Sequence, residues 1–119
     1  MKILHICSSY FSSDIYKNLI SELSHGDIEN IVYVPKYYLP NDNNLNVLSA
    51  PKRYNLFDRI LFYRKQKIGY DDICDRIDLS KISIIHSHNL FSGGYIAYKL
   101  HTNFGIPYII ALRNTDLNV

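Results

Sequence analysis

The sequence has no tryptophan, one methionine, two cysteines and only two glutamates, Glu22 and Glu29. Cys7 and Cys74 are too few for a disulfide framework and lack the spacing of a zinc motif, so we interpret them as reduced structural thiols of a cytoplasmic protein. Neither glutamate ends a predicted strand, and the chain therefore offers no convincing acid and base pair.

Strong charge and long apolar runs are also missing. Thirteen Lys and Arg residues against eleven Asp and Glu residues give a net charge of +2, which is too small to indicate a nucleic acid partner. The apolar run at residues 2–7 is too short for a signal peptide, and no later run approaches the length of a membrane span. We expect a soluble chain, and its 119 residues suffice for one domain only.

Common nucleotide-binding and nucleophile motifs are absent as well. No G-x-G-x-x-G follows the first apolar run, no P-loop is present, and no serine lies in a G-x-S-x-G turn. These absences exclude simple dinucleotide, P-loop and serine-hydrolase interpretations.

What the sequence does contain is an alternation of short β-branched runs with helical patterns. Ser12 or Ser13 caps the first helix, Gly69 is expected to interrupt the second helical region, and Gly105 ends the last helix. The predicted strands are 2–7, 28–34, 45–48, 82–85 and 108–112, and the predicted helices are a segment from Ser13 toward Gly26, then 55–68, 71–78 and 92–104.

Strands that alternate with helices imply right-handed crossovers and a mostly parallel sheet. We therefore predict an α/β, Rossmann-like fold with helices on both faces, formed by a single domain over residues 1–119. The last strand ends a few residues before Val119. Because a further helix would ordinarily cover that strand, we expect the chain to be one piece of a longer protein.

Three polar turns are expected to meet at the carboxyl edge of this sheet: residues 8–13, 86–94 and 113–116. Open α/β sheets bind ligands at that edge, and helix amino termini there favour anions. Arg113 adds a forked cation for phosphate or carboxylate. The pair Gly93-Gly94 allows close approach of a ligand, although the alternative is that it only permits tight helix packing.

His86 and His88 share a face if their strand continues that far, and such a pair could supply two metal ligands. The sequence places no third ligand nearby. We therefore predict no metal site, and we interpret the pair as hydrogen-bonded or substrate-contacting groups. His5, within the first strand, is predicted to be a hydrogen-bonded core histidine.

The segment from Ile84 to Tyr95, IIHSHNLFSGGY, followed by Gly105-Ile106-Pro107-Tyr108, resembles the amino-terminal domain of GT-B glycosyltransferases of group 1, family 4. The resemblance spans the chain, since Met1 to Ile6 is similar to the family's opening strand. It implies half of a GT-B architecture, namely the acceptor-binding domain of a retaining, hexosyltransferase-like enzyme. The nucleotide-sugar donor would be a co-substrate, no other cofactor is implied, and a carboxyl-terminal domain would bind the donor.

The resemblance also implies roles for individual residues. Arg113 falls where many members have a histidine beside the reacting sugar, and it would be the catalytic residue that stabilises the departing phosphate charge. Ser12 and Ser13 stand where the family often has two glycines. The implied acceptor-binding residues are His88, Asn89, Asn114 and Asp116, and those near the donor phosphate are Ser12, Ser13, Gly93 and Gly94.

Two alternatives stay open at this point. The chain could instead be a stand-alone Rossmann-like module that binds a nucleotide or a phosphorylated small molecule without chemistry. Residues Lys52 to Lys67 are rich in basic and aromatic side chains, which suits peripheral contact with an anionic membrane and a lipid-linked acceptor. The simpler interpretation, which we favour, is a core-packed helix with a solvated basic side, in which both Phe57 and Phe62 are buried.

Overall fold

The computed structural model of the chain describes residues 1–8, 10, 14–24, 26–35, 47–50 and 62–111. Within them, five strands form one sheet in the order β3-β2-β1-β4-β5, and every neighbouring pair is parallel. This is a Rossmann-like order, in which the chain winds outward in both directions from β1 and β4. The predicted fold class is therefore confirmed. The strands are β1 Lys2–Ile6, β2 Glu29–Val34, β3 Val47–Ser49, β4 Ile84–Ser87 and β5 Tyr108–Ile110.

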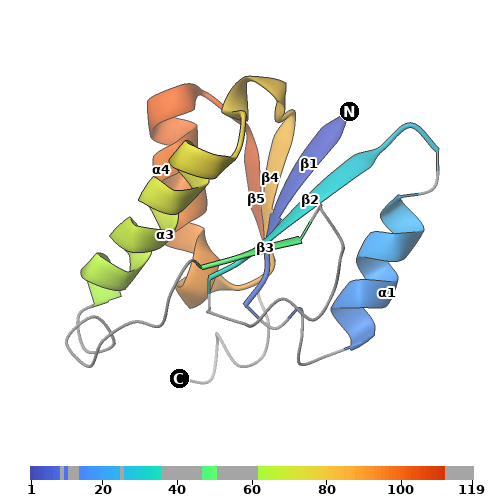
Figure 1. Ribbon diagram of the computed structural model, residues 1–119, viewed down its shortest axis with the longest axis horizontal. Coiled ribbons are helices and arrows are strands. Elements are labelled where there is room, and N and C mark those ends of the chain that lie inside the picture. The colour runs from blue at the N-terminus through green and yellow to red at the C-terminus, as the bar shows by residue number, and fades with distance from the viewer. Residues whose placement is uncertain (9, 11–13, 25, 36–46, 51–61, 112–119) are drawn as a thin grey trace.

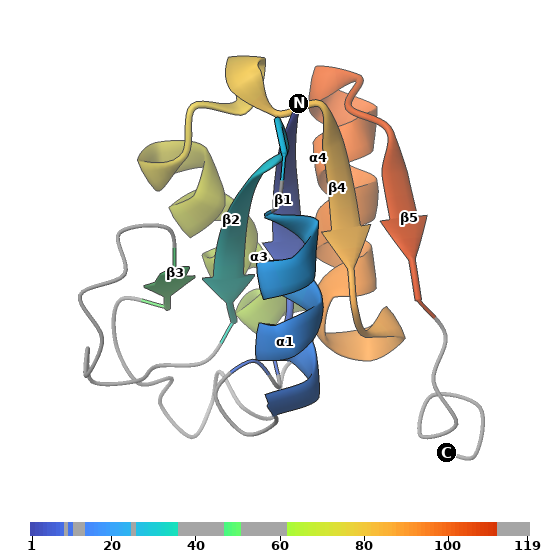
Figure 2. The same cartoon turned by 90° about the vertical axis from the view of Figure 1, so that its right-hand side faces the viewer.

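Helices lie on both faces of the sheet. Helix α1 (Asp14–Leu23) covers one face, while α3 (Phe62–Arg76) and α4 (Tyr95–Phe104) cover the other (Figures 1 and 2). Alternating side chains of β1 point to opposite faces, so Leu4 and Ile6 pack in the core beneath α3 and α4. The smaller core beneath α1 contains Cys7, Ile20, Val32 and Val34.

Helix α3 continues through Gly69, and the predicted interruption there is wrong. A Cβ atom at this position would lie 2.9 Å from Cδ1 of Ile96 in α4. Glycine therefore serves close packing of α3 against α4, which outweighs its low helix propensity. The earlier part of the predicted helix, residues 55–61, lies outside the described residues.

Helix α1 leaves part of its sheet face uncovered. Figure 2 shows α1 in front of β1, and no helix of the described part of the chain lies in front of β4 and β5. On this face Ile109 of β5 is 52% exposed, and the α1 residues Ile15 and Leu19 also face solvent although they belong to the apolar helical pattern. Among the predicted apolar positions of α1, Ile20 is the one that is buried.

Strand β4 begins and ends two residues later than predicted, because a short 3-10 turn, η1 (Leu79–Lys81), precedes it. Asp78 caps this turn by accepting a hydrogen bond from the Ser80 amide. Strand β4 ends at Ser87, one residue before His88, yet the rings of His86 and His88 lie on the same side of the sheet and stack on each other. At the end of α4, Gly105 adopts a φ of 72° and its amide donates to the His101 carbonyl, so the predicted stop is confirmed.

Within the described part of the chain, no helix combines the length and apolar character needed to cross a membrane. Cys7 and Cys74 are both free thiols, as predicted. Of the predicted membrane-facing segment Lys52 to Lys67, residues 52–61 lie outside the described residues, and the side chain of Phe62 is not described either.

Candidate functional site

Described residues from two of the three predicted turns meet at the carboxyl edge of the sheet, between β1 and β4. The Ser8 hydroxyl, just after β1, donates a hydrogen bond to Oδ1 of Asn89, just after β4, at 3.1 Å. The His88 amide donates to the Ile6 carbonyl at 2.9 Å, which holds the second turn against the first. Because the sheet order reverses between these strands, the two turns border the place where open α/β sheets bind ligands.

Gly93 and Gly94 are both buried in a π-type turn, η2 (Leu90–Gly94), that leads into α4. A Cβ on Gly93 would lie 2.6 Å from the Ser87 hydroxyl and 2.7 Å from a methyl group of Ile6. The structure thus supports the alternative interpretation of Gly93, in which the glycine permits tight packing of the turn against the sheet. Proximity of either glycine to a donor phosphate stays a prediction.

The remaining predicted site residues precede the described part of α1 or follow that of β5. Helix α1 is described from Asp14 and β5 to Ile110, with Ala111 after it. Those that lie outside the described residues are Ser12, Ser13, Arg113, Asn114 and Asp116.

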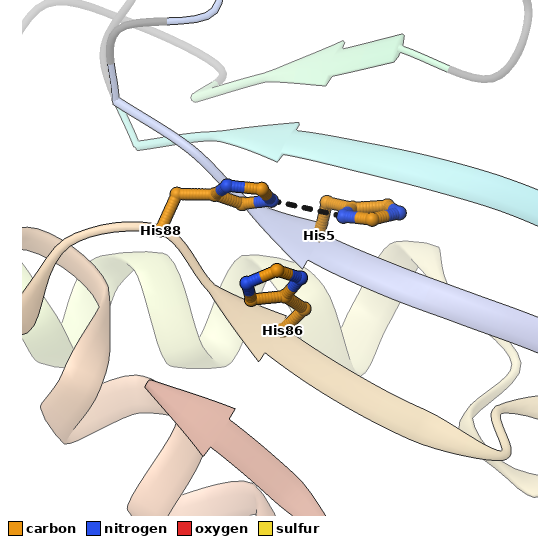
Figure 3. Close-up of side chains that lie close together, drawn as sticks. All are labelled: His5, His86 and His88. Atoms are coloured by element: carbon orange, nitrogen blue, oxygen red, sulfur yellow. Dashed lines mark hydrogen bonds between the residues drawn. The ribbon is translucent and has the colours of Figure 1, made fainter. Parts of the chain in front are cut away.

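Three histidines gather on the sheet face that α1 covers. The parallel register pairs His5 of β1 with His86 of β4, so both rings project to the same side, and His88 follows two residues later (Figure 3). The rings of His86 and His88 stack with centroids 4.0 Å apart, and the His5 and His88 centroids lie 5.2 Å apart. Tyr16 of α1 meets His88 edge to face at 5.6 Å.

A chain of hydrogen bonds orients these rings from the surface inward. Ser24 donates its hydroxyl proton to the Ile20 carbonyl and accepts from Nδ2 of Asn30, both at 2.9 Å. Oδ1 of Asn30 therefore faces Nε2 of His5 at 2.7 Å and accepts its proton. Nδ1 of neutral His5 is then an acceptor, and Nε2 of His88 donates to it at 3.0 Å. Satisfying every bond thus fixes one tautomer for each of the two buried rings.

Burial favours the neutral form of His5. Its side chain has no exposed surface, and removal from water lowers the pKa of His5 below the usual 6.5. The hydrogen bond to Asn30 raises that pKa and the charge of His86 lowers it, both by less than burial does. The prediction that His5 is a hydrogen-bonded core histidine is confirmed.

The expectation that no third imidazole lies near His86 and His88 is wrong, because the register of β1 supplies His5. One ring nitrogen from each of the three residues lies within 4.8 Å of the other two. Neutral imidazole is the commonest protein ligand for transition metals, so this cluster could hold a divalent ion.

The predicted acceptor-contacting residues differ in accessibility. His88 is fully buried, whereas Asn89 is half-buried at the edge itself. Contact with an acceptor stays a prediction for both, and Asn89 is the better placed of the two.

Sequence analysis missed the contributions of Ser8, Ser24 and Asn30. Ser8 belongs to a predicted polar turn, but its pairing with Asn89 depends on which strands are neighbours. Asn30 lies inside a strand otherwise rich in apolar residues, and a polar side chain at such a position indicates a buried partner. That partner, His5, becomes identifiable only when β1 and β2 are known to be adjacent.

Comparison of the chain with protein-family models, with curated proteins and with solved structures finds no match.

Proposed function

We propose that this chain is the acceptor-binding, Rossmann-like domain of a retaining glycosyltransferase of GT-B architecture. The complete enzyme would transfer a sugar from a nucleotide-sugar donor to an acceptor held at the carboxyl edge between β1 and β4. A second domain would bind most of the donor, so we predict no sugar transfer by residues 1–119 alone, because positioning two substrates requires both halves.

The observation that carries the proposal is the hydrogen bond between Ser8 and Asn89, which lies where the order of the strands in the sheet reverses. The Asn89 amide and the Ser8 hydroxyl both offer hydrogen-bonding groups suited to a polyhydroxylated ligand. The segment IIHSHNLFSGGY, which carries the resemblance to family 4 enzymes, contains both β4 and Asn89.

In this proposal Arg113 would stabilise the charge that develops on the departing donor phosphate. Substituting Arg113 by alanine in the complete enzyme should then lower turnover more than it weakens acceptor binding. A defect confined to acceptor affinity would assign Arg113 to substrate binding instead.

Ligand-observed NMR with the purified chain tests the proposal. The probes are methyl glycosides and sugar phosphates as acceptor mimics, and uridine and guanosine diphosphates as nucleotides. We expect binding of at least one carbohydrate probe, weakened about fivefold by Asn89→Ala, which corresponds to one hydrogen bond of about 1 kcal/mol. The matched control is Asn103→Ala, an exposed asparagine of α4 that bonds Tyr70 away from this edge.

Binding of nucleotides with no carbohydrate binding would favour the alternative, a stand-alone module for a nucleotide or a phosphorylated small molecule. Carbohydrate binding that Asn103→Ala weakens as much as Asn89→Ala would also contradict the proposal. Robust sugar transfer by the chain alone would refute the division of labour between two domains.

A further inference from the structure

The histidine cluster lies on the α1 face of the sheet. His5 and His88 have no exposed surface, and His86 is half-buried. Apolar side chains suffice to pack a core, so three imidazoles gathered on β1, on β4 and directly after β4 call for a chemical explanation. We propose that His5, His86 and His88 bind one divalent transition-metal ion.

The separations of the ring nitrogens suit such an ion after small movements. In a tetrahedral site with metal–nitrogen bonds of about 2.0–2.1 Å, ligand nitrogens lie about 3.4 Å apart. His5 Nδ1 and His88 Nε2 are 3.0 Å apart, and the three-residue set spans no more than 4.8 Å. The His86 ring stacks on that of His88 (Figure 3), and a change in its side-chain torsions would be needed to bring the third nitrogen to the same spacing.

The residue behind His5 matches the support that metal-bound histidines usually have. A ligating imidazole donates its other N–H to an oxygen acceptor, which fixes the ring and its tautomer. Nε2 of His5 donates to Oδ1 of Asn30, and Asn30 is itself held by Ser24. This arrangement leaves Nδ1 of His5 as the lone pair that faces His88, which is the state a metal ligand requires.

Ion binding replaces the hydrogen bond between His5 and His88. The proton on Nε2 of His88 moves to its Nδ1, so both facing nitrogens present lone pairs and neither of these two rings loses a proton. His86 binds as neutral imidazole, and where its ring carries a second proton, that proton is released to water. Three nitrogen ligands select ions such as Zn²⁺, Co²⁺ and Ni²⁺ over Mg²⁺ and Ca²⁺, which prefer oxygen. Water can complete the coordination, as it does at other three-histidine sites.

The ion would reach the cluster from the side of His86. Helix α1 covers β1, whereas among the described residues no helix stands in front of β4 on this face (Figure 2). His86 projects from β4 at the border of the covered region and is the most accessible of the three side chains. It is therefore the ligand whose replacement disturbs folding least.

Titration of the tag-free, chelator-treated chain with Zn²⁺ by calorimetry, and with Co²⁺ by visible absorption, tests this proposal. We expect one ion per chain and a Co²⁺ spectrum typical of tetrahedral nitrogen coordination, with no comparable uptake of Mg²⁺. His86→Ala should weaken binding at least tenfold. His101→Ala, which removes an exposed histidine of α4 outside the cluster, should leave the affinity unchanged.

A second variant, Asn30→Ala, removes the partner of His5 and should weaken binding by about tenfold to a hundredfold. Circular dichroism of each variant confirms that the fold is retained. The proposal is overturned if neither Zn²⁺ nor Co²⁺ binds, if His86→Ala binds as tightly as the unmodified chain, or if His101→Ala removes the binding.

Discussion

Replacing Gly93 by alanine tests how tightly the turn after β4 is packed against the sheet. The added Cβ would lie 2.6 Å from the Ser87 hydroxyl and 2.7 Å from Cγ2 of Ile6. Ser87 cannot withdraw freely, because its hydroxyl donates to the Asn89 carbonyl at 2.7 Å. Overpacking of this kind costs about 1–3 kcal/mol, and a lost hydrogen bond adds about 1 kcal/mol.

Alanine offsets part of that cost, because it favours helical backbone by up to about 1 kcal/mol over glycine. We therefore expect Gly93→Ala to lower the free energy of unfolding by about 2 kcal/mol. With an unfolding entropy of about 2.1 cal/mol/K per residue, the melting temperature should fall by about 8 °C. Urea unfolding and thermal melting followed by circular dichroism measure both quantities.

The neighbouring glycine supplies a matched control. A Cβ on Gly94 would lie 3.3 Å from Cδ1 of Ile110, the mobile end of a side chain that can rotate away. Gly94→Ala should change the unfolding free energy by no more than about 0.5 kcal/mol, the range of substitutions that disturb no special feature. Equal stabilities of the two variants would refute the packing argument for Gly93.

Further predictions concern the rest of the fold. Gly69→Leu should destabilise the chain by about 1–3 kcal/mol, because its Cβ meets Ile96; an unchanged urea midpoint would contradict the close packing of α3 and α4. Asn30→Ala should cost about 1–3 kcal/mol by leaving buried His5 without its acceptor, and a change below 0.5 kcal/mol would show that the chain of bonds is unimportant. Because burial lowers the pKa of His5 in the folded chain, the unfolded chain takes up a proton at His5 at a higher pH than the folded chain does. The free energy of unfolding should therefore fall as the pH drops below about 6.5, by at most about 1.4 kcal/mol per pH unit for this group. Urea midpoints that stay level between pH 7.5 and 5.5 would contradict this. Co-sedimentation with anionic liposomes tests the segment Lys52 to Lys67: binding that weakens with salt supports membrane contact, and no binding at low salt supports the core-packed helix.

Local sequence signals predicted most of the fold. Alternation of β-branched runs with helical patterns was enough for the order of strands and helices, and Gly105 marked the end of α4 because a positive φ favours glycine. Gly69 misled the same reasoning. Its role depends on the distance to Ile96, a residue 27 positions later, and no local pattern contains that information.

The histidine cluster shows the same limit more clearly. The spacing of His86 and His88 predicted a shared face, and the two rings do stack, although β4 ends one residue before His88. Their meeting with His5 depends on the register between β1 and β4, which long-range hydrogen bonds set. Sequence alone shows which side chains of a strand share a face of the sheet. It does not show the register, that is, which residues of the neighbouring strand lie beside them. Side chains that combine across strands are therefore the part of a site that sequence analysis finds last.

Amide chemical-shift mapping shows whether the edge between β1 and β4 recognises a carbohydrate acceptor, as we propose. The isotope-labelled chain is titrated with the carbohydrate probe that binds best. We predict that the largest shifts fall on the amides of Ser8, His88 and Asn89. Shifts confined to the hollow between α3 and α4, which is lined by residues such as Tyr70 and Lys99, would contradict this proposal.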